Sequence, residues 1–282
     1  MRFNIIAPML QTLLTILVIL TFSTQAQTYR ANRDQLPLLE AGAGVVWGTT
    51  PHYPGSDEHT TIVVPFPTFQ YRGDVVRADE DGGLRTRYLF NDNAEINLSI
   101  GGSLPVSSDD NDEREGMPKL NTILEFGPGL IVHFVPKEKR KKFRLSLNVP
   151  VRLAVSTDLK LTKERGIVFN PLLYGFYSFT RNFTLFAGLS GRWVSQKYNA
   201  YLYDVASNFE TANRETYQAS SGYVQTTLGL GAIFNFKDYS MFLGYSFDDA
   251  SQSSNSNSPL FVKDQSYSAA VGITWWFYEL YK

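Results

Sequence analysis

A short segment near the start of the chain gathers side chains that could do chemistry. His52 and His59 flank a Tyr-Pro-Gly-Ser-Asp stretch, and Ser56, Asp57 and Glu58 lie between them. A hydrolase would need a serine beside a base that a third group orients. Ser56 with either histidine is the only local pairing of that kind, and no nucleophile elbow or glycine-rich oxyanion loop accompanies it. The two histidines could also bind a metal, but we favour solvated histidines in a polar turn.

The densest run of charge is acidic and spans residues 107–116, SSDDNDEREG. Its carboxylates are hard oxygen ligands of the kind that calcium prefers, and they belong to Asp109, Asp110, Asp112 and Glu113. Their spacing matches no recognised calcium loop. We therefore expect a solvated loop and assign no metal ligand, with divalent-ion bridging to lipopolysaccharide as an alternative.

A second run has the opposite charge and spans residues 136–142, PKEKRKK. A basic turn of this kind either solubilises its end of the protein or contacts an anionic partner or lipid phosphates.

Period-two alternation predicts the elements that position these side chains. In the stretch SYSAAVGITWWF, residues 266–277, bulky apolar side chains occupy the odd positions and mostly small ones the even positions. Successive side chains of a strand point to opposite faces, so this stretch is a strand with two unlike faces. Similar alternation recurs at residues 94–101, 143–155, 183–193, 224–236 and 239–247. Residues 167–179 are apolar on both faces, and their phase stays open.

The lengths of these strands and of their connections predict a barrel. The strands run for about 9 to 13 residues, which suits a tilted strand that crosses a bilayer. Tight turns at 91–93, 181–182 and 237–238 alternate with long polar segments at 104–118, 156–165, 197–221 and 248–265. This parity is typical of outer-membrane barrels, which have short periplasmic turns and long outer loops. We predict an all-β fold, a closed antiparallel transmembrane β-barrel of about twelve strands, with ten to fourteen as the range.

In such a barrel the apolar face contacts lipid and the small, polar face lines the lumen. The last strand ends in aromatic residues, and amphipathic rings favour the membrane interface. We therefore expect Trp275, Trp276 and Phe277 to lie at that interface.

The predicted inward face carries charges that need partners, because an unpaired charge is costly to bury. The main members of this predicted network are Arg87, Glu95, Glu125, His133, Arg144 and Arg152. Arg87 would lie diagonal to Glu95. If residues 134 and 143 pair across the basic turn, Glu125 lies opposite Arg152 and His133 opposite Arg144. Such a network would either lock a narrow barrel or form a charged constriction that selects solutes.

Composition and targeting signals agree with an exported membrane protein. The 282 residues have a formal net charge of −1 and include no cysteine, which argues against nucleic-acid partners and excludes thiolate chemistry. Residues 1–26 have a positive start, an apolar stretch and small residues before position 27. We interpret them as a cleaved secretory signal peptide, although a retained anchor is the alternative. Residues 27–282 would then form one barrel domain.

Several motifs resemble those of the MipA/OmpV family of Gram-negative outer-membrane proteins. Gly42 and Gly44 resemble its early G-x-G strand, and VVPFPTFQYRG at 63–73 resembles the strand that follows. The most specific motif is the stretch Tyr53, Pro54, Gly55, Ser56 and Asp57. YNAYLYDV at 198–205 and the pair Ser258 and Pro259 resemble later loops, so the resemblance covers about 40–277.

The resemblance implies an outer-membrane barrel without a catalytic motif. It implies a scaffold for cell-wall (murein) remodelling enzymes, with murein synthases and lytic transglycosylases as partners, or a surface interaction protein. We expect a non-enzymatic protein without a cofactor, in contact with outer-membrane lipid and lipopolysaccharide. A narrow diffusion pore with a charged lumen is the first alternative, and a membrane lipid-modifying hydrolase is the second.

Overall fold

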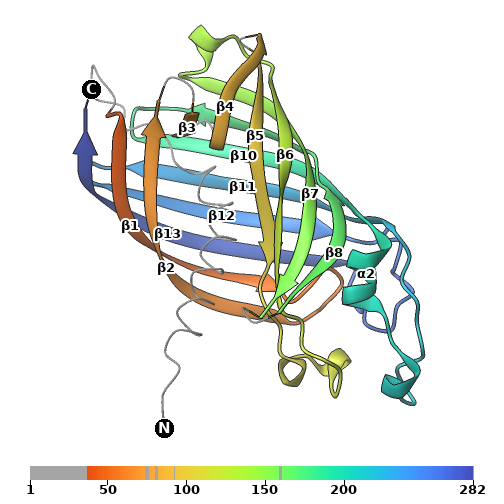
Figure 1. Ribbon diagram of the computed structural model, residues 1–282. Coiled ribbons are helices and arrows are strands. Elements are labelled where there is room, and N and C mark those ends of the chain that lie inside the picture. Colours follow the sequence, from red (N-terminus) through yellow and green to blue (C-terminus); the bar gives the residue numbers. More distant parts are fainter. Residues whose placement is uncertain (1–36, 74–75, 80–81, 92, 159–160, 282) are drawn as a thin grey trace.

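The computed structural model describes residues 37–73, 76–79, 82–91, 93–158 and 161–281. The predicted signal peptide, residues 1–26, lies outside these residues. One antiparallel sheet dominates the described chain (Figure 1). Its strands are β1 (Leu39–Pro51), β2 (His59–Arg72), β3 (Val76–Asp79), β4 (Gly82–Asn91), β5 (Ala94–Ser103), β6 (Thr122–His133), β7 (Phe143–Thr157), β8 (Thr162–Phe169), β9 (Leu172–Ser178), β10 (Phe183–Val194), β11 (Gly222–Asn235), β12 (Tyr239–Asp249) and β13 (Gln265–Leu280).

The strand pairings return to their starting point. Each strand pairs with the next along the chain except β8 with β9, and β1 pairs with β13 from Leu39↔Leu280 to Thr49↔Ala269. β8 and β9 lie end to end between β7 and β10, since both neighbours pair with both segments. The thirteen strands therefore occupy twelve places in the cycle, and the all-β prediction is confirmed. The cycle is thinnest where β2 meets β3, at two residue pairs.

The break between β8 and β9 explains why residues 167–179 could not be phased. Asn170 and Pro171 interrupt the strand, and a proline has no N–H to give to the ladder. Side chains on the inner face here are also apolar, because Val168, Tyr174 and Phe176 are all buried. Both faces therefore carry apolar side chains, and alternation in polarity disappears.

The connections differ between the two ends of the sheet. Short turns that follow β4, β9 and β11 lie at one end, together with the basic turn at 134–142. Longer loops at 52–58, 104–121, 195–221 and 250–264 lie at the other end, where Figure 1 places helix α2 (Gln196–Tyr203). The predicted long loop at 156–165 is wrong, since β7 continues to Thr157 and β8 begins at Thr162.

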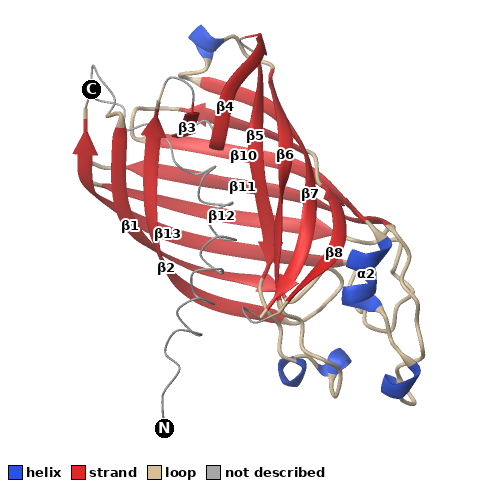
Figure 2. Cartoon of the chain, viewed as in Figure 1, coloured by secondary structure: helices blue, strands red, loops and turns tan. Residues whose placement is uncertain are grey.

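Among the described residues, short helices occur only in the connections between strands, as Figure 2 shows. They are η1 (Ser108–Asp110), η2 (Asp112–Arg114), η3 (Lys137–Lys139), η4 (Ser207–Phe209) and α2. No helix among the described residues is both long and apolar enough to cross a bilayer.

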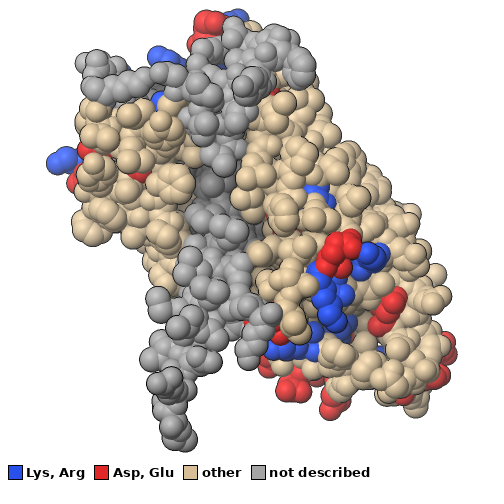
Figure 3. Space-filling model, viewed as in Figure 1, with Lys and Arg blue, Asp and Glu red and all other residues tan. Residues whose placement is uncertain are grey.

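The outer wall is apolar in the way that alternation predicted. Exposed large side chains on it include Ile96, Leu98, Val151, Leu153 and Leu243. On the face shown in Figure 3, charged residues lie mainly toward the two ends, and the wall between them is largely uncharged. An apolar band between two polar ends is the surface that a bilayer-spanning barrel needs.

Candidate functional site

Four loops interlock over one end of the sheet, and we call this assembly the loop cap. It comprises residues 52–58, 104–121, 195–221 and 250–264. Tyr53, Tyr203 and Phe261 come from three of these loops and belong to one buried apolar cluster. Tyr203 is fully buried; its ring centroid lies 6.1 Å from that of Tyr53 and 6.4 Å from that of Phe261. The loops thus carry an apolar core of their own.

The Tyr-Pro-Gly-Ser-Asp motif lies where loops of the cap contact one another. Gly55 has a φ of +88°, and a Cβ built on it would lie 2.3 Å from Cδ2 of Phe261. The carbonyl oxygen of Gly55 accepts hydrogen bonds from the backbone N–H groups of Val262 and Lys263, at 2.8 and 3.0 Å. Only glycine suits this position, because it tolerates a positive φ and lets the aromatic ring lie directly on the backbone.

Two further hydrogen bonds join the motif to distant loops, and a third joins two of those loops to each other. The Tyr203 hydroxyl donates to the carbonyl oxygen of Pro54 at 2.7 Å. The Tyr53 hydroxyl donates to the carbonyl oxygen of Leu260 at 3.0 Å, and Ser258 Oγ donates to that of Tyr203 at 2.9 Å. The sequence predicted the Tyr53 motif and the Ser258–Pro259 pair separately, and the structure brings them together through Tyr203.

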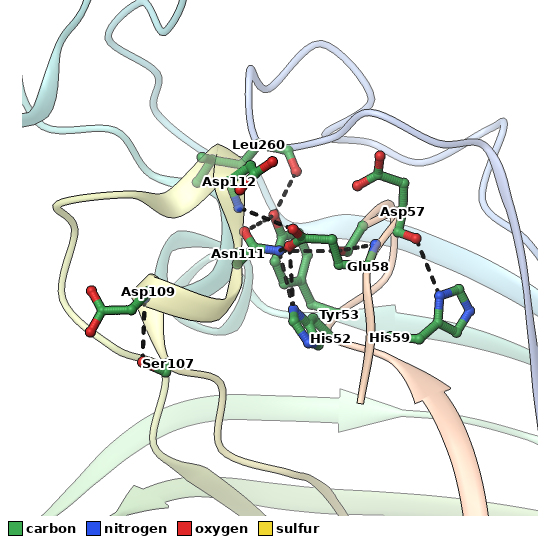
Figure 4. Close-up of polar contacts among 11 residues, drawn as sticks. His52, Tyr53, Asp57, Glu58, His59, Ser107, Asp109, Asn111, Asp112 and Leu260 are labelled. Atoms are coloured by element: carbon green, nitrogen blue, oxygen red, sulfur yellow. Dashed lines mark hydrogen bonds and ion pairs between the residues drawn. The ribbon is translucent and has the colours of Figure 1, made fainter. Parts of the chain in front are cut away.

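Asn111 of the acidic loop is the polar centre of the cap (Figure 4). Its side-chain Nδ2 donates to Ser56 Oγ and to His52 Nδ1, each at 3.2 Å, and also contacts Glu58 Oε2. Both Asn111 and Ser56 are about 1% exposed. Burial lowers the pKa of His52, against the opposing effect of the Glu58 carboxylate. A neutral imidazole is therefore favoured, in agreement with a ring nitrogen that accepts from Asn111.

The geometry around Ser56 is that of a buried structural hydroxyl. Ser56 Oγ also accepts from the backbone N–H of Glu58 at 3.3 Å. Ser56 and His52 thus share the Asn111 amide as a partner, and the structure gives no hydrogen bond between them within the described residues. Asp57 contributes its backbone carbonyl oxygen to His59 Nδ1 at 3.2 Å.

The acidic loop folds back on the motif through Glu58. Its Oε1 accepts from the backbone N–H of Asp112 at 3.2 Å, and Ser107 Oγ caps the adjacent turn by accepting from the N–H of Asp109 at 3.3 Å. No group of three or more His, Cys, Asp or Glu side chains in the described ranges is arranged to hold a metal ion.

Beneath the cap, a charged cluster occupies the barrel interior. Glu125 is 0% exposed, and its carboxylate is paired with Arg152 at 3.3 Å and Arg192 at 2.5 Å. The Tyr198 hydroxyl of α2 also donates to Glu125, at 3.2 Å. Helix α2 therefore connects the cap with the interior. Tyr198 was missed as a partner of this cluster, because nothing in the spacing of a loop residue shows that it reaches a strand 73 positions away.

The predicted register of β6 and β7 was wrong by two residues. Glu125 lies opposite Ala154 and not opposite Arg152, and His133 lies opposite Ser146 and not opposite Arg144. The prediction assumed that residue 134 pairs with residue 143 across the basic turn. That turn contains the short helix η3, and His133 pairs with Ser146, two residues further along β7 than the assumption requires. Glu125 and Arg152 still meet diagonally, because both side chains point inward.

The other predicted inward charges have separate partners. His133 Nδ1 lies 2.8 Å from Ser146 Oγ, and its Nε2 lies 3.3 Å from Glu95 Oε1. The Arg144 guanidinium lies 4.5 Å from the centre of the Phe176 ring. The side chain of Arg87 lies outside the described part of the structure.

The aromatic end of β13 divides between the two faces. Trp275 and Phe277 point outward and are 51% and 55% exposed, whereas Trp276 is 5% exposed. The expectation that Trp276 lies at the membrane interface is therefore wrong. Its position alternates with those of its neighbours, so its indole faces inward, where Nε1 donates to Ser240 Oγ at 3.2 Å.

The early G-x-G strand makes room for inward rings. A Cβ on Gly42 would lie 3.2 Å from the Trp276 ring and 2.5 Å from a backbone oxygen of β13, and a Cβ on Gly44 would lie 2.6 Å from the Phe66 ring. These two glycines let β1 lie close to the aromatic side chains of its neighbours.

Comparison with known proteins agrees with this architecture. The family model described as "MltA-interacting protein MipA" matches residues 41–277, and no curated protein matches. The translocator domain of the autotransporter NalP from Neisseria meningitidis is similar with a TM-score of 0.50 and 12% identity, over 92% of this chain and 93% of that one. An outer membrane channel from Pseudomonas putida gives a TM-score of 0.49 and 11% identity, over 88% of this chain and 100% of that one.

At 12% sequence identity, the similarity to the NalP translocator domain shows a common fold and nothing about function. The family match is of a different kind, since it covers most of the chain and includes the motifs that build the cap. It confirms the resemblance found in the sequence. The chain therefore belongs to the MltA-interacting protein MipA family and is an outer-membrane protein.

Proposed function

We propose that this protein is a non-enzymatic interaction scaffold of the outer membrane, with murein synthases and lytic transglycosylases as its partners. The description of its family as MltA-interacting supports a partner among murein enzymes. The buried, amide-bonded state of Ser56 supports a role without catalysis, because a nucleophile has to reach its substrate.

The packed loop end is the observation that carries this proposal. The cap has its own apolar core, and Tyr203, which ties two of its loops together, is fully buried. A conduit would need an open mouth at this end, whereas a scaffold needs only stable surfaces. We therefore assign the function to the surface of the protein and not to its interior.

The turn end is the surface that we expect murein enzymes to contact. In barrels of this kind the short turns face the periplasm, where these enzymes work. Lys139, Lys141 and Lys142 of the basic turn are exposed, and Arg181 and Lys237 lie in neighbouring turns. A basic surface favours an acidic partner and speeds the encounter with it.

A binding measurement with purified proteins tests this role. We would immobilise the full chain in detergent and measure binding of a purified lytic transglycosylase and a purified murein synthase. We expect the Lys139→Glu, Lys141→Glu double variant to lose binding, and the Lys163→Glu, Lys263→Glu variant, which reverses two exposed charges at the loop end, to keep it. Absence of binding to the unmodified protein, or equal binding by both variants, would contradict the proposal.

A narrow diffusion pore is the second candidate, and the charged interior around Glu125 favours it. Single-channel conductance in a planar bilayer separates the two. We expect no discrete steps from folded, inserted protein, because the packed loops of the cap would obstruct one end. Steps whose ion selectivity changes in an Arg152→Gln variant would place the pore ahead of the scaffold.

A further inference from the structure

A shallow apolar groove crosses the outward face of the wall from β7 to β1. Its volume is about 1090 Å³, and residues of β7, β9, β10, β11, β12, β13 and β1 line it. Gly175 pairs with Ala187 across β9 and β10, and Leu185 pairs with Ala232 across β10 and β11. Small side chains therefore alternate with leucines on this part of the wall and leave a depression between them.

The groove is longer than one extended acyl chain, so a single chain would fill only the part of it nearest Phe143. Seven strands give six spacings of roughly 4.8 Å, or about 29 Å measured along the curved wall. The groove runs across tilted strands, so it passes obliquely through a hydrocarbon core that is about 30 Å thick. One end is at Phe143, beside the basic turn, and the other is at Trp47, near the cap.

An aromatic row marks the membrane interface at the Phe143 end. Ring centroids are 6.5 Å apart for Phe143 and Tyr177, 4.7 Å for Tyr177 and Phe179, and 5.6 Å for Phe179 and Phe183. Outward aromatic side chains of barrels gather at the level of the lipid headgroups. Lys142 Nζ lies 5.7 Å from the centre of the Tyr177 ring, so an ammonium group stands at headgroup level where the groove ends.

We propose that this groove binds an anionic phospholipid of the periplasmic leaflet, with one acyl chain in the part of the groove next to Phe143 and the phosphate beside Lys142. The apolar lining selects a lipid chain, and the ammonium group selects a negative headgroup. The turn end points to phospholipid and not to lipopolysaccharide, which occupies the opposite leaflet. This site rests on the outer-membrane location of the protein and not on the scaffold role.

Native mass spectrometry of the full chain in detergent tests the headgroup contact. Phosphatidylglycerol and phosphatidylethanolamine with identical acyl chains would compete for the protein. We expect phosphatidylglycerol adducts to dominate and Lys142→Ala to weaken their binding about fivefold, which is the usual value of one lysine near an anionic surface. Lys163→Ala, which removes an exposed lysine at the other end, should leave the competition unchanged.

A second pair of variants tests the groove. Ala187→Leu adds bulk inside it, and Ala43→Leu adds the same bulk to an outward position of β1 that does not line it. We expect Ala187→Leu alone to reduce adducts of both phospholipids, with heat-modifiable gel mobility as the check on folding. The proposal is overturned if the protein binds both lipids equally, or if Lys142→Ala leaves the competition unchanged. It is also overturned if the two leucine variants carry equal adducts.

Discussion

The hydroxyl of Tyr203 donates a hydrogen bond to the carbonyl oxygen of Pro54, although 149 positions separate the two residues. Tyr203 ends helix α2, and Pro54 belongs to the family motif in the first loop. Burial raises the pKa of Tyr203 well above its ordinary value, so the hydroxyl keeps its proton and remains a donor. This one contact joins the first loop to the loop that carries α2.

Removing that hydroxyl should loosen the cap. In Tyr203→Phe the carbonyl oxygen of Pro54 loses its donor, and a buried acceptor without a partner costs about 1–3 kcal/mol. We expect the loops at 52–58 and 195–221 to be cleaved faster by an external protease in intact cells. Tyr239→Phe is the matched control, since Tyr239 is exposed at the turn end. Equal cleavage of the two variants would show that the hydrogen bond does not hold the cap.

Gly55→Ala should destabilise the cap more strongly. The new methyl group would collide with the Phe261 ring at a φ of +88°, where a side chain is strained at a cost of about 1–3 kcal/mol. Urea unfolding, followed by tryptophan fluorescence, measures the loss. Phe261→Leu in the same chain should recover part of it, because a smaller side chain relieves the collision. If the double variant is less stable than Gly55→Ala alone, the collision is not the cause.

The buried cluster beneath the cap predicts a non-additive response. Glu125→Gln leaves Arg152 and Arg192 without their shared carboxylate, and breaking a buried pair in this way costs about 3–5 kcal/mol. Adding Arg192→Met removes one of the unpaired charges. The double variant should therefore lose less stability than the sum of the two single variants. A complete double-mutant cycle in urea decides this, and strict additivity would mean that the two residues act independently.

The strands of the barrel wall were predictable from the sequence because successive residues face lipid and lumen in turn. Lipid requires apolar side chains, whereas the lumen accepts polar ones. β5 and β7 alternate between apolar and polar side chains, so both phases were assigned correctly. Prediction failed where that contrast is absent. Around Tyr174 the interior is itself apolar, and at Trp276 an aromatic type that suits the interface faces inward instead.

The cap could not be predicted, since its contacts depend on how distant loops fold together. The Tyr53 motif and Ser258–Pro259 were recognised as motifs, yet no periodicity relates loop residues that lie about 200 positions apart. The inward charges could be predicted because they lie on strands whose side chains alternate between apolar and polar. Which charges pair depends on the register of β6 and β7, and the conformation of the basic turn sets that register.

The contact between the first loop and the acidic loop should weaken in acid. Burial lowers the pKa of His52 below its ordinary value, about 6.5, although Glu58, Asp110 and Asp57 oppose this effect and His59 adds to it. The unfolded loop therefore takes up a proton first as the pH falls. The stability from neutral His52 is present above about pH 6.5 and is lost as the pH falls toward the lower folded pKa.

Hydrogen exchange of residues 104–121 at pH 7.5 and pH 5.5, corrected for intrinsic rates, measures this effect. We expect lower protection at pH 5.5 in the unmodified protein. His52→Gln should remove most of the difference, and His59→Gln, in the same segment, should preserve it. An unchanged difference in His52→Gln would assign the pH response to another group.

Ser56 provides the test that separates a structural motif from a hydrolytic one. Its hydroxyl accepts from Asn111 Nδ2 and from the backbone N–H of Glu58. Ser56→Ala removes this acceptor, while the Asn111 amide keeps His52 and Glu58 as partners, so the expected loss of stability is about 1 kcal/mol. Release of fatty acid from lipopolysaccharide and phospholipid vesicles should be at background level with the unmodified protein and with Ser56→Ala alike. Hydrolysis by the unmodified protein that disappears in a folded Ser56→Ala variant would reverse this assignment, because loss of the two hydrogen bonds to this hydroxyl cannot abolish a reaction in which it takes no part.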